Sequence, residues 1–221
     1  MNEPSHVSRL STLRLIAGPA LIAVAVTALR AFGEVHGWPK PLVNSGVCGK
    51  AILGVAWLVP VFGVYFALRL SRAGSQPRHL ISAAPLAIAS VLLKLGGTAI
   101  MERPGLGYAT RLSLNFAITA LALGLQAIAW PDLFKALLAY GYASRIPIAV
   151  VAFLAMRGHW GTHYDALDPG FPQIGFWPTY VRVSLVPNMF FMEAYTVAVG
   201  GLLGICTVVA MRQLRPLLQQ R

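Results

Sequence analysis

The chain has 221 residues, of which 57% are hydrophobic and 11% are charged, and its formal net charge is +11. Ordinary soluble domains carry about 25% charged residues, so a chain this apolar needs lipid as part of its solvent. Its Lys and Arg residues flank apolar runs and do not gather on one polar face, which argues against nucleic-acid binding. We therefore expect a protein of the lipid bilayer with no nucleic-acid partner.

Six apolar stretches predict the architecture. A bilayer core about 30 Å thick needs about 20 apolar residues in each helix that crosses it. The stretches that meet or approach this length are 13–32, 50–70, 80–101, 111–130, 132–156 and 182–210. We interpret the first as a retained helix, because no clear small-residue cleavage site follows it. The predicted fold class is all-α, a polytopic transmembrane helical bundle with six membrane helices in one domain over residues 1–221.

The distribution of Lys and Arg predicts the orientation. If the N-terminus is cytoplasmic, the inside segments carry nine of these residues, the outside loops carry six, and three lie within apolar runs. The cytoplasmic loops of membrane proteins usually hold the excess of positive charge. We therefore expect both termini in the cytoplasm, a bacterial-type cytoplasmic membrane as the location, and an outward loop over residues 157–181.

Chemically versatile side chains gather in this predicted loop, whose residues 157–172 read RGHWGTHYDALDPGFP. Imidazoles and carboxylates are common ligands of catalytic Zn²⁺, which keeps one position open for water. The candidate ligands for zinc or another divalent metal are His159, His163, Asp165, His36 and Glu34. With a metal bound, Glu102 or Asp168 is a candidate general base. This pattern fits a metal-dependent membrane-embedded hydrolase or transferase that acts at the outer face.

The same loop also fits the boundary between membrane and water. Trp and Tyr gather at membrane interfaces because their rings are amphipathic. The aromatic residues that fit such a belt are Trp160, Tyr164, Phe171, Phe176, Trp177 and Tyr180. Asp165 is placed to cap a turn, and Asp168-Pro169-Gly170 is typical of a turn. We prefer this structural interpretation of the loop to the metal site.

Three ionisable residues lie inside the apolar stretches, namely Lys94, Arg145 and Glu193. Ionisable groups within a membrane are costly and by default mark functional positions. Their depths along the helices overlap, so we expect Glu193 to pair with one of the two cations. Asn115 and Asn188 supply polar groups near that level. The set predicts either an electropositive cavity for an anionic solute or lipid headgroup, or a buried ion pair that fixes helix register.

The order of several polar residues resembles that of membrane lipid phosphatases of the type-2 phosphatidic acid phosphatase family. Lys94 precedes Arg103-Pro104, and Ser144-Arg145 precedes His159. The interval between Lys94 and Arg103 is longer than in that family, and the family's PSGH box is absent from the sequence. No catalytic residue therefore carries over to this chain.

These observations favour a non-catalytic role, either as a small permease-like protein or as a membrane subunit or scaffold of a larger assembly. The metal-dependent enzyme is the alternative. Gly200 and Gly204 have the GxxxG spacing that allows membrane helices to approach closely. This spacing predicts that a homo-oligomer could form through these two glycines.

Overall fold

A computed structural model describes residues 11–47, 51–77, 79–101 and 105–219, and all regular structure within these residues is helical. The first five helices are α1 (Thr12–Val35), α2 (Leu58–Arg72), α3 (Leu80–Met101), α4 (Tyr108–Ala129) and α5 (Pro131–Gly158). The last helical rod consists of α6 (Phe176–Tyr180), the π-helical turns η1 (Val181–Leu185) and η2 (Pro187–Phe191), and α7 (Met192–Gln219). The predicted all-α class is confirmed.

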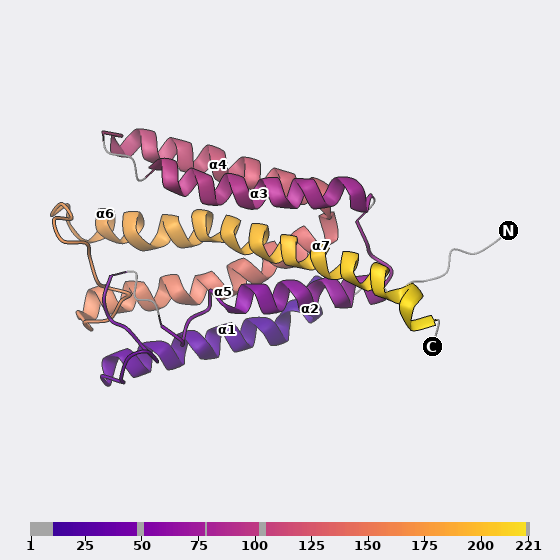
Figure 1. Cartoon of the computed structure of the whole chain (residues 1–221). Coiled ribbons are helices and arrows are strands. Elements are labelled where there is room, and N and C mark those ends of the chain that lie inside the picture. Colours follow the sequence, from indigo (N-terminus) through magenta and orange to yellow (C-terminus); the bar gives the residue numbers. More distant parts are fainter. Residues whose placement is uncertain (1–10, 48–50, 78, 102–104, 220–221) are drawn as a thin grey trace.

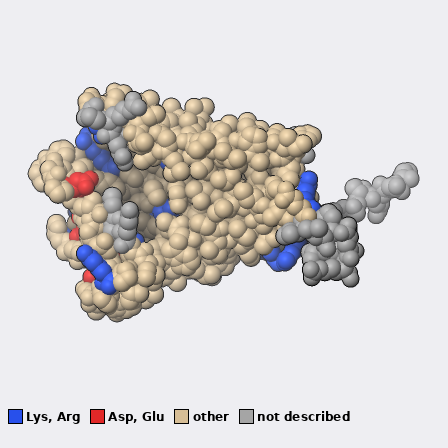
Figure 2. Space-filling view, in the orientation of Figure 1, with Lys and Arg blue, Asp and Glu red and all other residues tan. Residues whose placement is uncertain are grey.

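Five helical segments of the described chain are long and apolar enough to cross a membrane. They are Thr12–Val35, Leu80–Ile100, Tyr108–Ala129, Pro131–Gly158 and Phe176–Gln213. Large apolar side chains face outward on the α3–α4 hairpin, where Ile81, Leu121 and Ile128 are 93%, 60% and 71% exposed. Figure 2 shows Lys and Arg concentrated at the two ends of the bundle and Asp and Glu at one of these ends, with a mostly uncharged surface between the ends. This surface suits a multi-pass membrane protein.

The second predicted helix is shorter than the sequence indicated. It begins at Leu58 and has 15 residues, a length of about 22 Å. The bilayer core is about 30 Å thick, so α2 alone does not span it. The apolar residues before it form a loop because the amides of Ile52 and Leu53 donate to the carbonyls of Pro41 and Leu42, at 3.0 Å each. The prediction of a helix over 50–70 is therefore wrong for residues 51–57.

The predicted outward loop is also shorter than 157–181. Helix α5 continues to Gly158 and is capped by His159, whose φ of 50° is left-handed. Helix α6 begins at Phe176. The Thr179 hydroxyl in its first turn donates to the carbonyl of Gly175, the residue before the helix, at 2.7 Å. The loop between the helices therefore covers residues 159–175.

The helices run back and forth along one axis, with α7 through the middle of the bundle (Figure 1). The α3–α4 hairpin packs on one side of α7, and α2 and α5 pack on the other, with α1 against α5. The start of α1 and the end of α7 lie at the same end of the bundle (Figure 1). We call the opposite end, which carries the loop segments 36–47 and 51–57 and the loop 159–175, the loop end. Its placement outside the cell stays a prediction.

The glycines of the GxxxG pattern are buried inside the chain's own bundle. A Cβ atom on Gly63 of α2 would lie 2.6 Å from the Gly200 carbonyl oxygen, so these two helices touch backbone to backbone. A Cβ on Gly204 would lie 2.6 Å from Leu133 of α5. The pattern therefore serves packing within one chain. Gly200 and Gly204 are not available for the homo-oligomeric contact that the sequence suggested.

Candidate anion-binding cavity

A cavity of about 730 Å³ lies at the loop end, between α1, α5 and the last helical rod. The loop segments 36–47 and 51–57 and the loop 159–175 supply the rest of its described wall. Figure 2 shows the molecule hollowed at this end, with Lys and Arg atoms inside the hollow. Cavities of roughly 300–1,000 Å³ are typical of small-molecule sites. Three arginines line it, namely Arg30, Arg145 and Arg182, and Asp168 is the carboxylate in its described lining.

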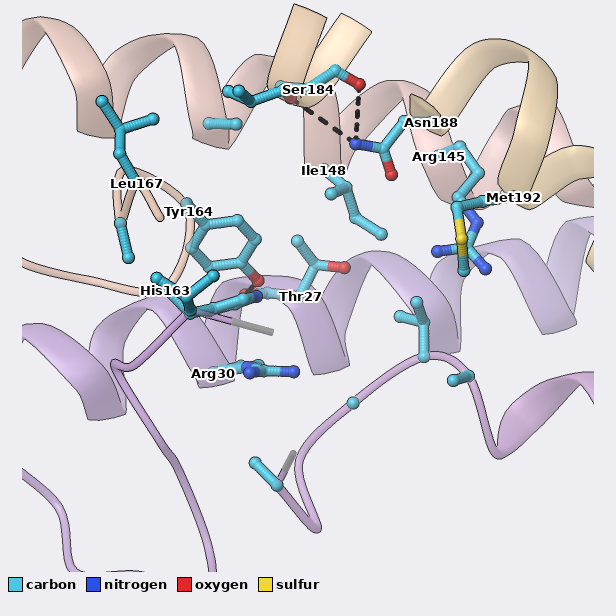
Figure 3. A pocket seen from close by; sticks show the side chains of 18 of the residues that line it. Thr27, Arg30, Arg145, Ile148, His163, Tyr164, Leu167, Ser184, Asn188 and Met192 are labelled. Atoms are coloured by element: carbon cyan, nitrogen blue, oxygen red, sulfur yellow. Dashed lines mark hydrogen bonds between the residues drawn. The ribbon is translucent and has the colours of Figure 1, made fainter. Parts of the chain in front are cut away.

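Arg145 is the deepest charge in the wall of this cavity. It lies 13 residues before the end of α5 at Gly158, about 20 Å along the helix axis. The residue is 5% exposed, and its Nε has no hydrogen-bond partner among the described residues. Figure 3 shows its side chain among those that line the cavity. A guanidinium this deep in a membrane is costly unless a partner offsets its charge.

Glu193 is the acid nearest to Arg145 in the described chain, but the two do not form an ion pair. Glu193 is 1% exposed, and neither carboxyl oxygen has a hydrogen-bond partner among the described residues. Its carboxyl group occupies the space where Gly141 lacks a side chain. Because Gly141 is one helical turn before Arg145, the carboxyl lies within electrostatic reach of the guanidinium. The pairing expected for Glu193 is therefore an attraction at a distance, without direct contact.

A network of charges holds the mouth of the cavity. Arg30 donates from Nε to one Glu34 oxygen at 2.8 Å. The other oxygen accepts from the His163 backbone amide at 2.8 Å and lies 2.7 Å from its Nδ1. The His163 ring packs on Tyr164, whose hydroxyl donates to the Thr27 carbonyl at 3.4 Å. Burial raises the pKa of the Tyr164 hydroxyl, which therefore stays a neutral donor. The network ties the loop 159–175 to α1.

The two asparagines have different surroundings. Asn188 lines the cavity and donates to the Ser184 carbonyl of its own helix at 2.9 Å (Figure 3). Asn115 accepts from the Lys94 ammonium at 3.2 Å, in a separate cavity between α3, α4 and the last rod. The structure thus divides the predicted intramembrane set, because Lys94 and Arg145 lie on different sides of α7.

The structure brings together two of the predicted metal ligands, His163 and Glu34, whereas the other three have separate local roles. Asp165 caps a turn, accepting from the Thr162 amide at 2.7 Å and its hydroxyl at 2.6 Å. His36 lies with Nδ1 2.8 Å from the Phe32 carbonyl and stacks on the Phe32 ring. His159 ends α5, so it shares no helix face with His163. Within the described ranges, no three His, Cys, Asp or Glu side chains form a set that could hold a metal ion. Glu102 lies outside the described residues.

Sequence reasoning missed two cations of the cavity, Arg30 and Arg182. Both stand near helix ends, where cations are ordinary in membrane proteins. The four-residue spacing of Arg30 and Glu34 was a usable signal, because it places opposite charges on one helix face. No such signal existed for Arg182, which lies in the π-helical turn η1.

No protein-family model matches the chain, and no curated protein or solved structure matches it.

Proposed function

We propose that this protein is a small permease-like carrier that binds an anionic solute in the cavity at the loop end. The observation that carries the proposal is Arg145, a buried guanidinium in the cavity wall whose Nε has no hydrogen-bond partner in the described chain. A bound carboxylate or phosphate would supply that partner, and the planar guanidinium suits both groups. A scaffold needs no such cavity, so the cavity favours a solute-binding role.

The charges around the cavity support an anion over a cation. Arg30 already has Glu34 as a partner, and Asp168 stands among the lining residues. Arg145 and Arg182 leave the lining with an excess of positive charge. In a low-dielectric wall, this excess attracts an anion more strongly than it would in water. Arg182 and Arg30 would guide the solute at the mouth, and Arg145 would bind it at depth.

The cavity is closed toward the other end of the bundle by a hydrophobic core. That core includes Phe62, Phe66, Leu137 and Tyr140, and the three aromatic rings pack edge to face or tilted at 5.2–6.2 Å between centroids. A carrier must open this seal while closing the mouth. The π-helical turns η1 and η2 stand beside the cavity, and such turns are frequent at functional sites.

Thermal unfolding of the full-length protein in detergent tests the proposal. The probes are inorganic phosphate, acetate, succinate and citrate, each compared with chloride at equal ionic strength. We expect at least one to raise the unfolding temperature of the wild type but not of Arg145→Gln. Arg14→Gln is the matched control, because Arg14 is exposed at the start of α1. The same stabilisation in Arg145→Gln as in the wild type would reject Arg145 as the binding group.

A further inference from the structure

A second cavity, of about 460 Å³, lies between the α3–α4 hairpin and the last helical rod. Three of its lining residues are cations, namely Lys94, Arg111 and Arg182, and none of the described residues that line it is an acid. Arg182 and Met192 of the last helical rod line both cavities, so this part of the rod forms a wall between the two. A concave site with three cations attracts an anion.

Lys94 is built into this cavity and is not a surface charge. It is 8% exposed and lies seven residues before the end of α3 at Met101, about 10 Å along the axis. Its Nζ donates to the Asn115 oxygen at 3.2 Å and lies 5.5 Å from the centroid of the Phe191 ring. An ammonium group has three donors, and within the described chain Asn115 accepts from one of them. The others are available to a ligand.

The mouth of the cavity is held by an aromatic contact. The Arg182 guanidinium carbon lies 4.4 Å from the centroid of the Tyr108 ring, which links η1 to the start of α4. Stacking of this kind fixes the plane of the guanidinium and leaves its edge for hydrogen bonds. Arg182 at the mouth and Lys94 at depth would therefore contact the same bound anion from two sides.

The cavity continues onto the apolar outer surface of α3. Leu95 lines the cavity and is 55% exposed, and Leu92 on the same helix is 64% exposed. A free solute gains nothing from such a surface, whereas an acyl chain would cover it. The arrangement of the buried Lys94 and the exposed Arg182 at the mouth, beside an outward apolar face, matches a phospholipid, with its phosphate inside and its chains along α3.

We propose that this second cavity is a binding site for a phosphate-type anion, supplied by the headgroup of an anionic phospholipid. The site shares Arg182 with the cavity that contains Arg145 but has Lys94 as its buried cation, and the proposal does not depend on transport. Lys94 and Arg182 bind the phosphate oxygens, and Asn115 positions the Lys94 ammonium.

Native mass spectrometry of the full-length protein tests this site, with dioleoyl phosphatidylglycerol and phosphatidylcholine as competing probes. We expect the wild type to retain phosphatidylglycerol in preference, and Lys94→Met to weaken that binding roughly tenfold or more. Lys135→Met is the matched control, because it removes the same charge from a side chain that is 68% exposed in α5. Thr98→Trp fills the cavity but keeps every charge, so it should also lose the preference even if Lys94→Met fails to fold.

Equal retention of the two lipids by the wild type would overturn the proposal. An equal loss in Lys135→Met and Lys94→Met would also overturn it, because general attraction to the +11 charge would then explain the binding. A parallel thermal-unfolding series with inorganic phosphate separates the two sources of the anion. Stabilisation by phosphate alone, lost in Lys94→Met, would support the anion site but overturn its assignment to a lipid.

Discussion

Arg145 and Glu193 lie near each other in the bundle interior without direct contact, and this arrangement decides how the cavity can work. The Arg145 guanidinium lines the cavity, whereas Glu193 is not among the lining residues. The carboxyl stands over Gly141, where any other residue would displace it. An anion in the cavity and the Glu193 carboxylate would therefore attract the same guanidinium from different sides. Binding of an anion and ionisation of Glu193 would then change how strongly Arg145 is held.

A first prediction concerns this competition. Glu193→Gln keeps the size of the side chain but cannot ionise, so position 193 can no longer compete with a bound anion for Arg145. We expect the anion that stabilises the wild type to bind the variant more tightly, by up to about tenfold, which corresponds to about 1.4 kcal/mol. Titration of the unfolding temperature against anion concentration gives the comparison. Weaker binding in the variant would show that Glu193 supports the anion site.

At the scale of the elements, close contact between α2 and α7 holds the short second helix in the bundle. Gly63 and Gly200 meet with their backbones, and Gly204 packs against Leu133 and Ala67. Because α2 has 15 residues and does not span a bilayer core, its position depends on this contact more than on lipid. Small residues are the usual means of such close packing between membrane helices.

The second prediction tests this contact. Gly63→Ala places a methyl group against the Gly200 backbone, which cannot move away as a flexible side chain could. We expect destabilisation by about 1–3 kcal/mol, the usual cost of overpacking. Gly124→Ala on α4 is the control, because no atom lies within 4 Å of the added Cβ, and its expected effect is neutral or stabilising by about 0.5–1 kcal/mol. Equal unfolding temperatures for the two variants would contradict the packing argument.

At the scale of the whole molecule, the chain is a bundle whose start and end lie together, opposite the loop end that contains the cavity (Figure 1). The distribution of Lys and Arg along the sequence predicts that both termini lie in the cytoplasm. The cavity would then open toward the outside.

Cysteine labelling tests this third prediction. In a background of Cys48→Ser and Cys206→Ser, Leu167→Cys marks the loop end and Gln76→Cys marks the opposite end. We expect a membrane-impermeant maleimide to label Leu167→Cys in intact cells and Gln76→Cys only after permeabilisation. The reverse pattern would mean that the cavity opens to the cytoplasm.

Much of the fold could be predicted from the sequence because lipid requires long apolar helices, and length and composition reveal them directly. The start of α2 could not be predicted, since residues 51–57 are apolar enough for a helix but bond to the loop before them. Arg145 and Asn188 could be singled out because polar groups in a membrane are rare. The sequence could not predict that Arg145 and Asn188 line a different cavity from Lys94, because depth along a helix does not reveal which neighbouring helix a side chain faces.

We propose that Arg145 binds an anionic solute that the protein carries across the membrane. The most direct measurement is uptake into proteoliposomes of the radiolabelled anion that most raises the unfolding temperature, for the wild type, Arg145→Gln and Arg14→Gln. We predict saturable uptake by the wild type and by Arg14→Gln, and loss of uptake in Arg145→Gln while its secondary structure is retained. Uptake by Arg145→Gln at the wild-type rate, or no uptake by any of the three, would contradict the account.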